Sequence, residues 1–217
     1  MELTIDFLSR WLHILFGITW IGLLYYFNFV QTEYFKEADP DARVDAFTKL
    51  APRALWWFRW GAMFTLITGL IMLAIRGAGL TMDIFVGSVM AILMFLNVWL
   101  IIWPNQKIVI ASNDQIKAGG EALPEAAGAA PKAALASRTN TLFSVPMLYF
   151  MVSSAHMPNG PFIGGNTTAL IIILIIIAAL ELNAIFGKQG PLTTVKGVIT
   201  SSFVLWAVLY GMLVVTG

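Results

Sequence analysis

The chain alternates between six long apolar stretches and connections that are shorter or richer in polar residues. A helix that crosses a bilayer needs about 20 mostly apolar residues, and each stretch approaches or exceeds that length. The fourth stretch is the least apolar and contains Pro146, and the pattern also allows it to begin earlier, within "AALASRTNT". We therefore predict an all-α, polytopic membrane protein forming a single domain over residues 1–217, with about six transmembrane helices at residues 5–30, 54–76, 83–103, 140–157, 167–187 and 197–216.

The basic residues are distributed unequally between the two ends of these predicted helices. Eleven of the 13 lysines and arginines lie in or beside the first, third and fifth connections, and Arg59 is counted among them as a helix-end residue. Only Arg10 and Arg76 lie on the other side. Connections rich in lysine and arginine stay in the cytoplasm, so we expect both termini outside.

Two connections carry local signals of their own. In the first, Asp39 and Pro40 resemble an N-cap followed by proline at the first helical position, which predicts a short surface helix. The third contains "KAGGEALPEAAGAAPKAALAS", which is biased towards alanine, glycine and proline. We predict a mobile cytoplasmic loop at about residues 108–136, with an Ala-rich end that can be helical.

The composition agrees with a membrane protein and excludes several kinds of chemistry. Hydrophobic residues make up 59% of the chain and charged residues 12%, about half the share in a soluble domain. The absence of cysteine excludes disulfides, thiolate metal sites, iron–sulfur clusters and covalent c-type haem. Acidic residues within "MELTIDFLSR" argue against a signal peptide, so we expect the first helix to be retained.

The chain has two histidines, His13 and His156, and the predicted topology places both in the outer half of the membrane. Two imidazoles at similar depth on different helices are what a bis-histidine haem b requires. Gly17 and Trp20 follow His13 on the same helical stripe, where a flat macrocycle would need space and an apolar wall. Arg10, one turn outward, and Arg76, at the outer end of the second helix, are candidate partners for haem propionates.

Two other interpretations of these histidines remain open. A membrane histidine also hydrogen-bonds across helices in a purely structural role. Met151 and Met157 flank His156, and thioethers suit Cu(I), so a copper site is the third interpretation. The residues alone do not choose between these.

Two carboxylates lie within or beside the predicted helices. Glu181 interrupts the fifth apolar stretch, and an ionisable residue in a span is a functional hypothesis by default. It is either a proton-relay group or the ion-pair partner of Arg59, which lies at comparable depth. Asp83, at the start of the third helix, is interpreted as a helix cap.

Three segments resemble the bacterial membrane urate hydroxylase family, defined by a urate oxidase N-terminal domain. They are "RWLHILFGITWIGLLYYFNFVQTEYF" (10–35), "LNVWLIIWPNQK" (96–107) and "SRTNTLFSVPMLYFMVSSAH" (137–156). The resemblance implies a helical domain in the bacterial inner membrane with an oxidoreductase role, and it favours His13 and His156 as haem ligands. Fuller members of the family carry a C-terminal cytochrome c domain, whose haem motif this cysteine-free chain lacks.

We therefore expect a redox protein that exchanges electrons with a separate cytochrome c or a larger membrane complex, in a process linked to urate oxidation. The expected surroundings are the lipid bilayer, and no nucleic-acid partner is expected. The alternatives are a non-catalytic accessory subunit of a larger complex and a metal-handling or transport protein. The spans show no inverted repeat of the kind typical of transporters.

Overall fold

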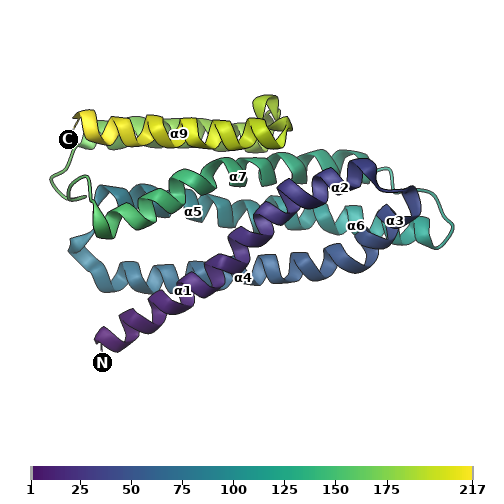
Figure 1. Ribbon diagram of the computed structural model, residues 1–217, viewed down its shortest axis with the longest axis horizontal. Coiled ribbons are helices and arrows are strands. Elements are labelled where there is room, and N and C mark those ends of the chain that lie inside the picture. The colour runs from purple at the N-terminus through teal and green to yellow at the C-terminus, as the bar shows by residue number, and fades with distance from the viewer. Residues whose placement is uncertain (1, 217) are drawn as a thin grey trace.

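The computed structural model describes residues 2–216, and this part of the chain is almost entirely helical, without a β-strand (Figure 1). One isolated bridge joins Thr81 to Pro161 between two connections. The all-α fold predicted from the apolar pattern is confirmed.

Three long helical runs form the first half of the molecule. In each run, helical segments follow one another directly, with a wider π-helical turn between them. The runs are α1 (Glu2–Tyr25), η1 (Tyr26–Gln31) and α2 (Thr32–Glu37); α3 (Pro40–Asp45), η2 (Ala46–Leu50) and α4 (Ala51–Arg76); and α5 (Met82–Leu96), η4 (Asn97–Ile102) and α6 (Trp103–Lys117).

The second half contains three helices, and short 3-10 turns lie in the connections of the molecule. These helices are α7 (Ala126–His156), α8 (Thr167–Phe186) and α9 (Val195–Thr216). The turns are η3 (Gly77–Gly79), between α4 and α5, and η5 (Gly190–Thr193), between α8 and α9. These runs and helices make six helical units. Each predicted span lies inside one of them, or extends past its end by no more than about two residues.

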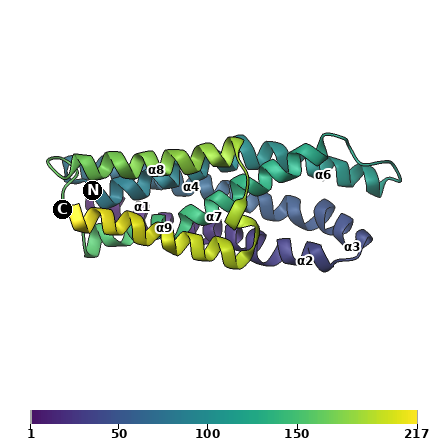
Figure 2. The same cartoon turned by 90° about the horizontal axis from the view of Figure 1, so that it is seen from above.

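Five of the helical units are long and apolar enough to cross a membrane, namely Leu3–Glu37, Pro40–Gly79, Met82–Lys117, Thr167–Phe186 and Val195–Val215. At about 1.5 Å per residue, the first three are roughly 50–60 Å long, whereas the hydrocarbon core of a bilayer is about 30 Å thick. Their α2, α3 and α6 ends extend well beyond α8 and α9 (Figure 2). The long connections at this end are therefore largely helical projections of the bundle.

This continuity corrects one of the sequence predictions and extends another. The segment 108–136, predicted as a mobile loop, is mostly helical, and only residues 118–125 separate α6 from α7. The short helix predicted at Asp39 and Pro40 does begin at Pro40, but it continues directly into η2 and α4. Local composition identified the helix start but could not reveal that neighbouring helices support these segments.

Helix α7 is the centre of the bundle. It packs against α1, α5, α6, α8 and α9, and about half of its residues are buried. Because other helices shield it from lipid, its buried face tolerates a run of polar side chains that would be costly against hydrocarbon. These residues include Arg138, Thr139, Asn140, Thr141, Ser144, Ser153 and Ser154.

Hydrogen bonds from these polar residues tie α7 to its neighbours. The Tyr25 hydroxyl bonds to the Ser144 hydroxyl at 2.9 Å, and Asn28 Nδ2 donates to Ser137 Oγ at 2.8 Å. On the other side, Asn140 Nδ2 donates to the carbonyl of Met94 in α5 at 2.9 Å. Hydrogen bonds and close packing replace the hydrophobic driving force that helices lose in lipid.

Asp83 joins the same helix to α5, which corrects its interpretation as a helix cap. Thr81 caps α5, because its hydroxyl accepts a hydrogen bond from the Ile84 N–H at 3.2 Å. Asp83 is fully buried and accepts from Ser153 Oγ at 2.7 Å, and from the backbone N–H and side-chain amide of Asn159 at 2.7 and 2.8 Å. It therefore fixes α5 to the end of α7 and to the loop that follows.

Pro146 interrupts the backbone hydrogen bonding of α7, and α9 compensates for it. A proline has no N–H, so the carbonyl four residues earlier, that of Leu142, loses its helical partner. Ser202 Oγ on α9 donates to this carbonyl at 2.7 Å and also lies 3.3 Å from the carbonyl of Thr141. Such side-chain rescue is how membrane helices accommodate proline.

We predict that Ser202→Ala lowers the free energy of unfolding by about 1 kcal/mol, because it leaves the buried Leu142 carbonyl unsatisfied. Denaturant unfolding of the purified protein in detergent, followed by circular dichroism, measures the change. The neighbouring, half-buried Ser201 is the matched control, and its replacement by alanine should change stability by less than about 0.5 kcal/mol. Equal stability of the two variants would contradict this role of Ser202.

Candidate functional site

A cavity of about 280 Å³ lies between α1, α4, α5 and α7, at the end of the bundle that holds the N-terminus. His13 and Trp20 line it from α1, Arg76 from α4 and His156 from α7. Helix α1 packs along α4 but separates from α7 towards this end, as Figure 1 shows. The divergence of α1 from α7 leaves the space that the cavity occupies.

The structure therefore brings five of the six predicted cofactor residues to one cavity: Arg10, His13, Trp20, Arg76 and His156. They come from three helices, and His13 and His156 are 143 positions apart in the sequence. Their meeting at one end of the bundle follows from the up-and-down course of α1, α4 and α7. The wall is completed mainly by aliphatic side chains of α4 and α5.

Helix α4 fixes the orientation of the His13 imidazole. Nδ1 lies 2.9 Å from the backbone carbonyl of Thr65 and 3.2 Å from the hydroxyl of Thr68. A carbonyl only accepts hydrogen bonds, so in the neutral ring Nδ1 carries the proton and Nε2 keeps a free lone pair. A backbone carbonyl holding Nδ1–H is the usual support for a histidine that ligates metal through Nε2.

His156 and Trp20 lie at opposite depths of the cavity. His156 is the last residue of α7 and is exposed. Trp20 is only 1% exposed and forms part of the wall further along α1. Its indole Nε1 has no hydrogen-bond partner. The cavity thus extends from an exposed histidine to a buried aromatic wall.

Gly69 on α4, and not Gly17, provides the space next to His13. A Cβ added at Gly69 would lie 3.1 Å from Cε1 of the His13 ring, whereas a Cβ at Gly17 would meet no atom within 4 Å. Gly17, a predicted cofactor residue, is not among the residues that line the cavity. Gly17 lies on the same face of α1 as His13, but the residue that packs against the His13 ring is Gly69 of the facing helix α4.

The two predicted cations differ in their surroundings. Arg10 forms an ion pair with Asp6, one turn earlier on α1, at 2.9 Å. Arg76 is half-buried at the C-terminal end of α4 and lines the cavity without an ion pair among the described residues. Arg76 is therefore the cation more readily available to an anionic group.

Sequence reasoning missed Thr65, Thr68 and Gly69, which form the α4 side of the His13 contact. Their spacing in "FTLITG" places them on one helix face, as i, i+3 and i+4. This pattern of small residues was the available signal. Ser88 of α5 and Ser154 of α7 add hydroxyl groups to the lining.

The predicted ion pair between Glu181 and Arg59 does not form. Glu181 Oε2 accepts a hydrogen bond from Asn97 Nδ2 at 3.1 Å, and the same nitrogen donates to Asn140 Oδ1 at 3.0 Å. The Arg59 guanidinium instead lies over the ring of Trp103, 3.2 Å from its centroid. Arg59 therefore contacts the face of Trp103, and Glu181 contacts the side-chain amide of Asn97, instead of forming an ion pair with each other.

Within the described residues, no three His, Cys, Asp or Glu side chains gather as a metal site. The two imidazoles are the nitrogen donors at the cavity, Met72 and Met151 add thioethers, and Arg10 and Arg76 are the cations. Such a set cannot complete the shell of a structural zinc ion, which takes four protein ligands.

We predict that Gly69→Val displaces the His13 ring, because the new side chain would occupy its space. Nitrogen NMR of histidine-labelled protein measures this directly, since the chain has only two histidines. The Nδ1–H signal of His13 should shift or broaden while the signals of His156 stay in place. Gly17→Val is the matched control and should leave both sets of signals unchanged; a shift there, or none in Gly69→Val, would contradict the geometry.

Comparison with known proteins identifies the family. The family model described as "Urate oxidase N-terminal" matches residues 76–215, well over half of the 217 positions. The matched region contains Arg76, Glu181 and His156, and α1 with His13 precedes it. No curated protein and no solved structure matches the chain. The resemblance found in the sequence is confirmed: the chain belongs to the urate oxidase N-terminal family.

Proposed function

We propose that this protein is a haem-binding redox protein of the bacterial inner membrane, in which His13 and His156 hold one b-type haem. The observation that carries this proposal is that the only two histidines of the chain line one cavity between α1, α4, α5 and α7. A haem bound there would supply one-electron redox chemistry. The positive-inside pattern would place this cavity on the periplasmic side.

Several features of the cavity support the fit of such a group. The hydrogen bond from His13 Nδ1 to Thr65 leaves Nε2 free to ligate. Gly69 leaves room for the His13 ring to pack against α4, and the lining is mostly apolar, as a porphyrin requires. Arg76 and Arg10 at the rim would take the propionates, although Arg10 shares its charge with Asp6.

Family membership supports a link to urate oxidation. Hydroxylation of urate by water releases two electrons and two protons, so a protein with a single one-electron group needs an acceptor that takes electrons singly. A separate cytochrome c or a larger membrane complex meets this need. In our proposal the chain conducts these electrons, and its described helices hold and orient the group that accepts them.

The absorption spectrum of the purified protein tests the haem site. We predict a Soret band in protein produced with sufficient haem, and a loss of at least about tenfold in bound haem for both His13→Ala and His156→Ala. Met157→Ala is the control, because Met157 is exposed beside His156 and does not line the cavity. Its haem content should equal that of the wild type.

A colourless wild-type protein would overturn the proposal. Copper bound in the wild type and lost in the Met157 variant would instead favour the copper interpretation. The link to urate is tested separately, by urate-dependent reduction of added cytochrome c. Reduction should occur with the wild type and fall to background with His13→Ala.

A further inference from the structure

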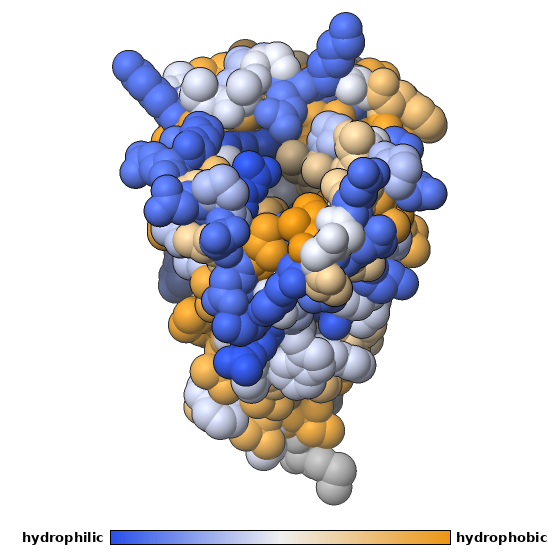
Figure 3. Space-filling view, turned by 90° about the vertical axis from the view of Figure 1, so that its right-hand side faces the viewer, coloured by the Kyte–Doolittle hydropathy of each residue, from blue (hydrophilic) through white to orange (hydrophobic). Residues whose placement is uncertain are grey.

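A second and larger cavity, of about 580 Å³, lies at the opposite end of the bundle. It is lined by residues of η1 and α2, of α3, η2 and the first part of α4, of η4 and α6, and of the first part of α7, together with Gln189 and Thr193 at η5. Figure 3 shows this end of the molecule hollowed in the middle, with apolar residues at the bottom and hydrophilic residues around the rim. The volume is within the range of small-molecule sites, and the haem proposal does not use it.

The charged residues in its lining are all basic. Lys36, Arg43 and Arg138 line the cavity, and no Asp or Glu is among the described lining residues. Glu33, which is outside the lining, forms an ion pair with Lys36 and also attracts Arg138 electrostatically, without an ion pair to it. Within the lining itself, no carboxylate balances the three basic side chains.

Arg138 is the unusual member of this group. It is only 3% exposed, and its Nη1 is buried without a hydrogen-bond partner. Burial of a charged group is costly unless it is paired. A guanidinium that remains unpaired at the wall of a cavity indicates that its partner is a ligand.

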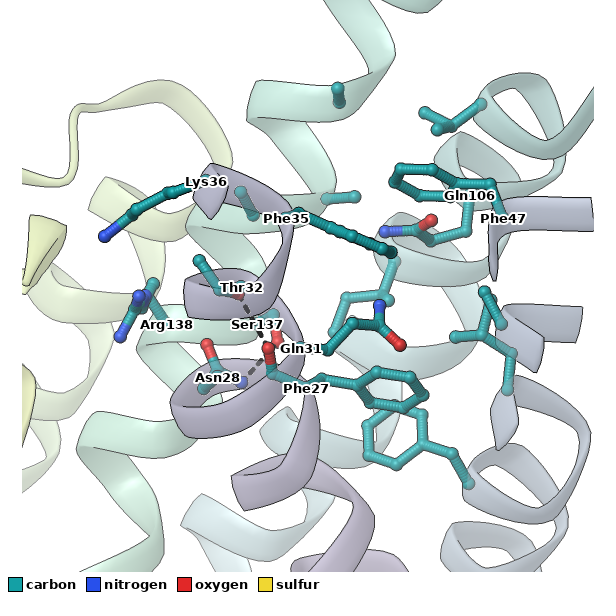
Figure 4. Close-up of a pocket in the computed structure, with 18 of the residues that line it drawn as sticks. Phe27, Asn28, Gln31, Thr32, Phe35, Lys36, Phe47, Gln106, Ser137 and Arg138 are labelled. Atoms are coloured by element: carbon teal, nitrogen blue, oxygen red, sulfur yellow. Dashed lines mark hydrogen bonds between the residues drawn. The ribbon is translucent and has the colours of Figure 1, made fainter. Parts of the chain in front are cut away.

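The rest of the lining favours a flat molecule with polar edges. Gln31 and Gln106 project towards the cavity on one side, near Phe27, Phe35 and Phe47, while Arg138 and Lys36 lie on the other (Figure 4). The rings of Phe35 and Phe47 stack with centroids 4.4 Å apart. Gln31 Oε1 is buried and has no hydrogen-bond partner, so it offers a free acceptor to a ligand N–H.

Within the described residues, the chain has three π-helical turns, and each of them contributes side chains to the lining of this cavity. Phe27, Asn28 and Gln31 come from η1, Phe47 from η2 and Ile102 from η4. Two of these turns end two residues before Pro52 and Pro104, where a wider turn relieves the clash of the proline ring with the preceding carbonyls. Such turns occur often at functional sites, and here they set which side chains reach the cavity.

We propose that this cavity binds a small, flat organic anion, with the anionic group at Arg138 and the ring system between Gln31, Gln106 and the phenylalanines. Binding would supply the charge that the buried guanidinium lacks and the donor that Gln31 Oε1 lacks. A charge-assisted contact to arginine is among the stronger hydrogen bonds in proteins. Urate is one member of this class of anion, and the inference does not depend on the haem or on urate oxidation.

Binding to the full-length purified protein in detergent tests the proposal. The probes are three pairs of flat molecules in which only the first is an anion: benzoate and benzamide, orotate and uracil, and urate and hypoxanthine. Isothermal titration should show saturable binding of at least one anion at one site per chain. That anion should bind at least about tenfold more tightly than its neutral partner.

Substitutions locate the binding site. Arg138→Gln should weaken the bound anion at least about tenfold while leaving the neutral partner unchanged, and Gln31→Met should weaken both. The matched control is Arg53→Gln, which removes the same group from an exposed position of α4 outside the cavity. Circular dichroism verifies that each variant is folded, and replacement of an unpaired buried charge by an amide should not lower stability.

Three results would overturn the inference: no binding of any anion, equal binding of an anion and its neutral partner, or full binding by folded Arg138→Gln. Displacement of the anion by phosphatidylglycerol vesicles, with tighter binding of the lipid, would also overturn it by assigning the cavity to a lipid headgroup. The same titration with His13→Ala separates the two sites. Anion binding retained in that variant, whatever its haem content, supports a cavity that acts independently of the histidines.

Discussion

Enclosure of α7 by other helices is the constraint on which the rest of the structure depends. A helix in hydrocarbon must satisfy its polar groups within the protein, and α7 carries more of them than any of its neighbours. Tyr25, Asn28 and Ser202 each supply a hydrogen-bond partner to α7 from another helix. The arrangement of α1, α5 and α9 around α7 follows from these needs, and the cavity with His13 lies where α1 departs from α7.

The two cavities differ in the chemistry that they offer. The cavity with His13 and His156 is apolar, with cations only at its rim, and suits a hydrophobic macrocycle. The cavity with Arg138 combines aromatic rings, amides and an unpaired buried charge, and suits a soluble anion. One bundle therefore presents two distinct environments, at its two opposite ends.

The sequence predicted the apolar helices well because lipid contact requires continuous hydrophobic surface, which is a local property of the chain. It also brought His13 and His156 to one end, because helix direction follows from counting the spans.

The sequence could not predict where α7 begins, since the polar residues of this helix are satisfied by partners such as Ser202, which is far away in sequence. The same limit explains why sequence reasoning misses Gly69 and why an ion pair with Arg59 is one of its two expectations for Glu181. A facing helix decides these contacts, and hydropathy does not identify the facing residue. The ion pair of Arg10 with Asp6, in contrast, has the i, i+4 spacing that is readable from sequence.

The close contact between α1 and α4 has a mechanical consequence. A Cβ at Gly61 would lie 3.2 Å from the backbone nitrogen of Trp20, so the two backbones nearly touch at this point. His13 lies on α1 before this contact and Gln31 in the same helical run beyond it. The contact at Gly61 therefore fixes the separation of the α1 and α4 backbones and supports the one helical run that carries both His13 and Gln31.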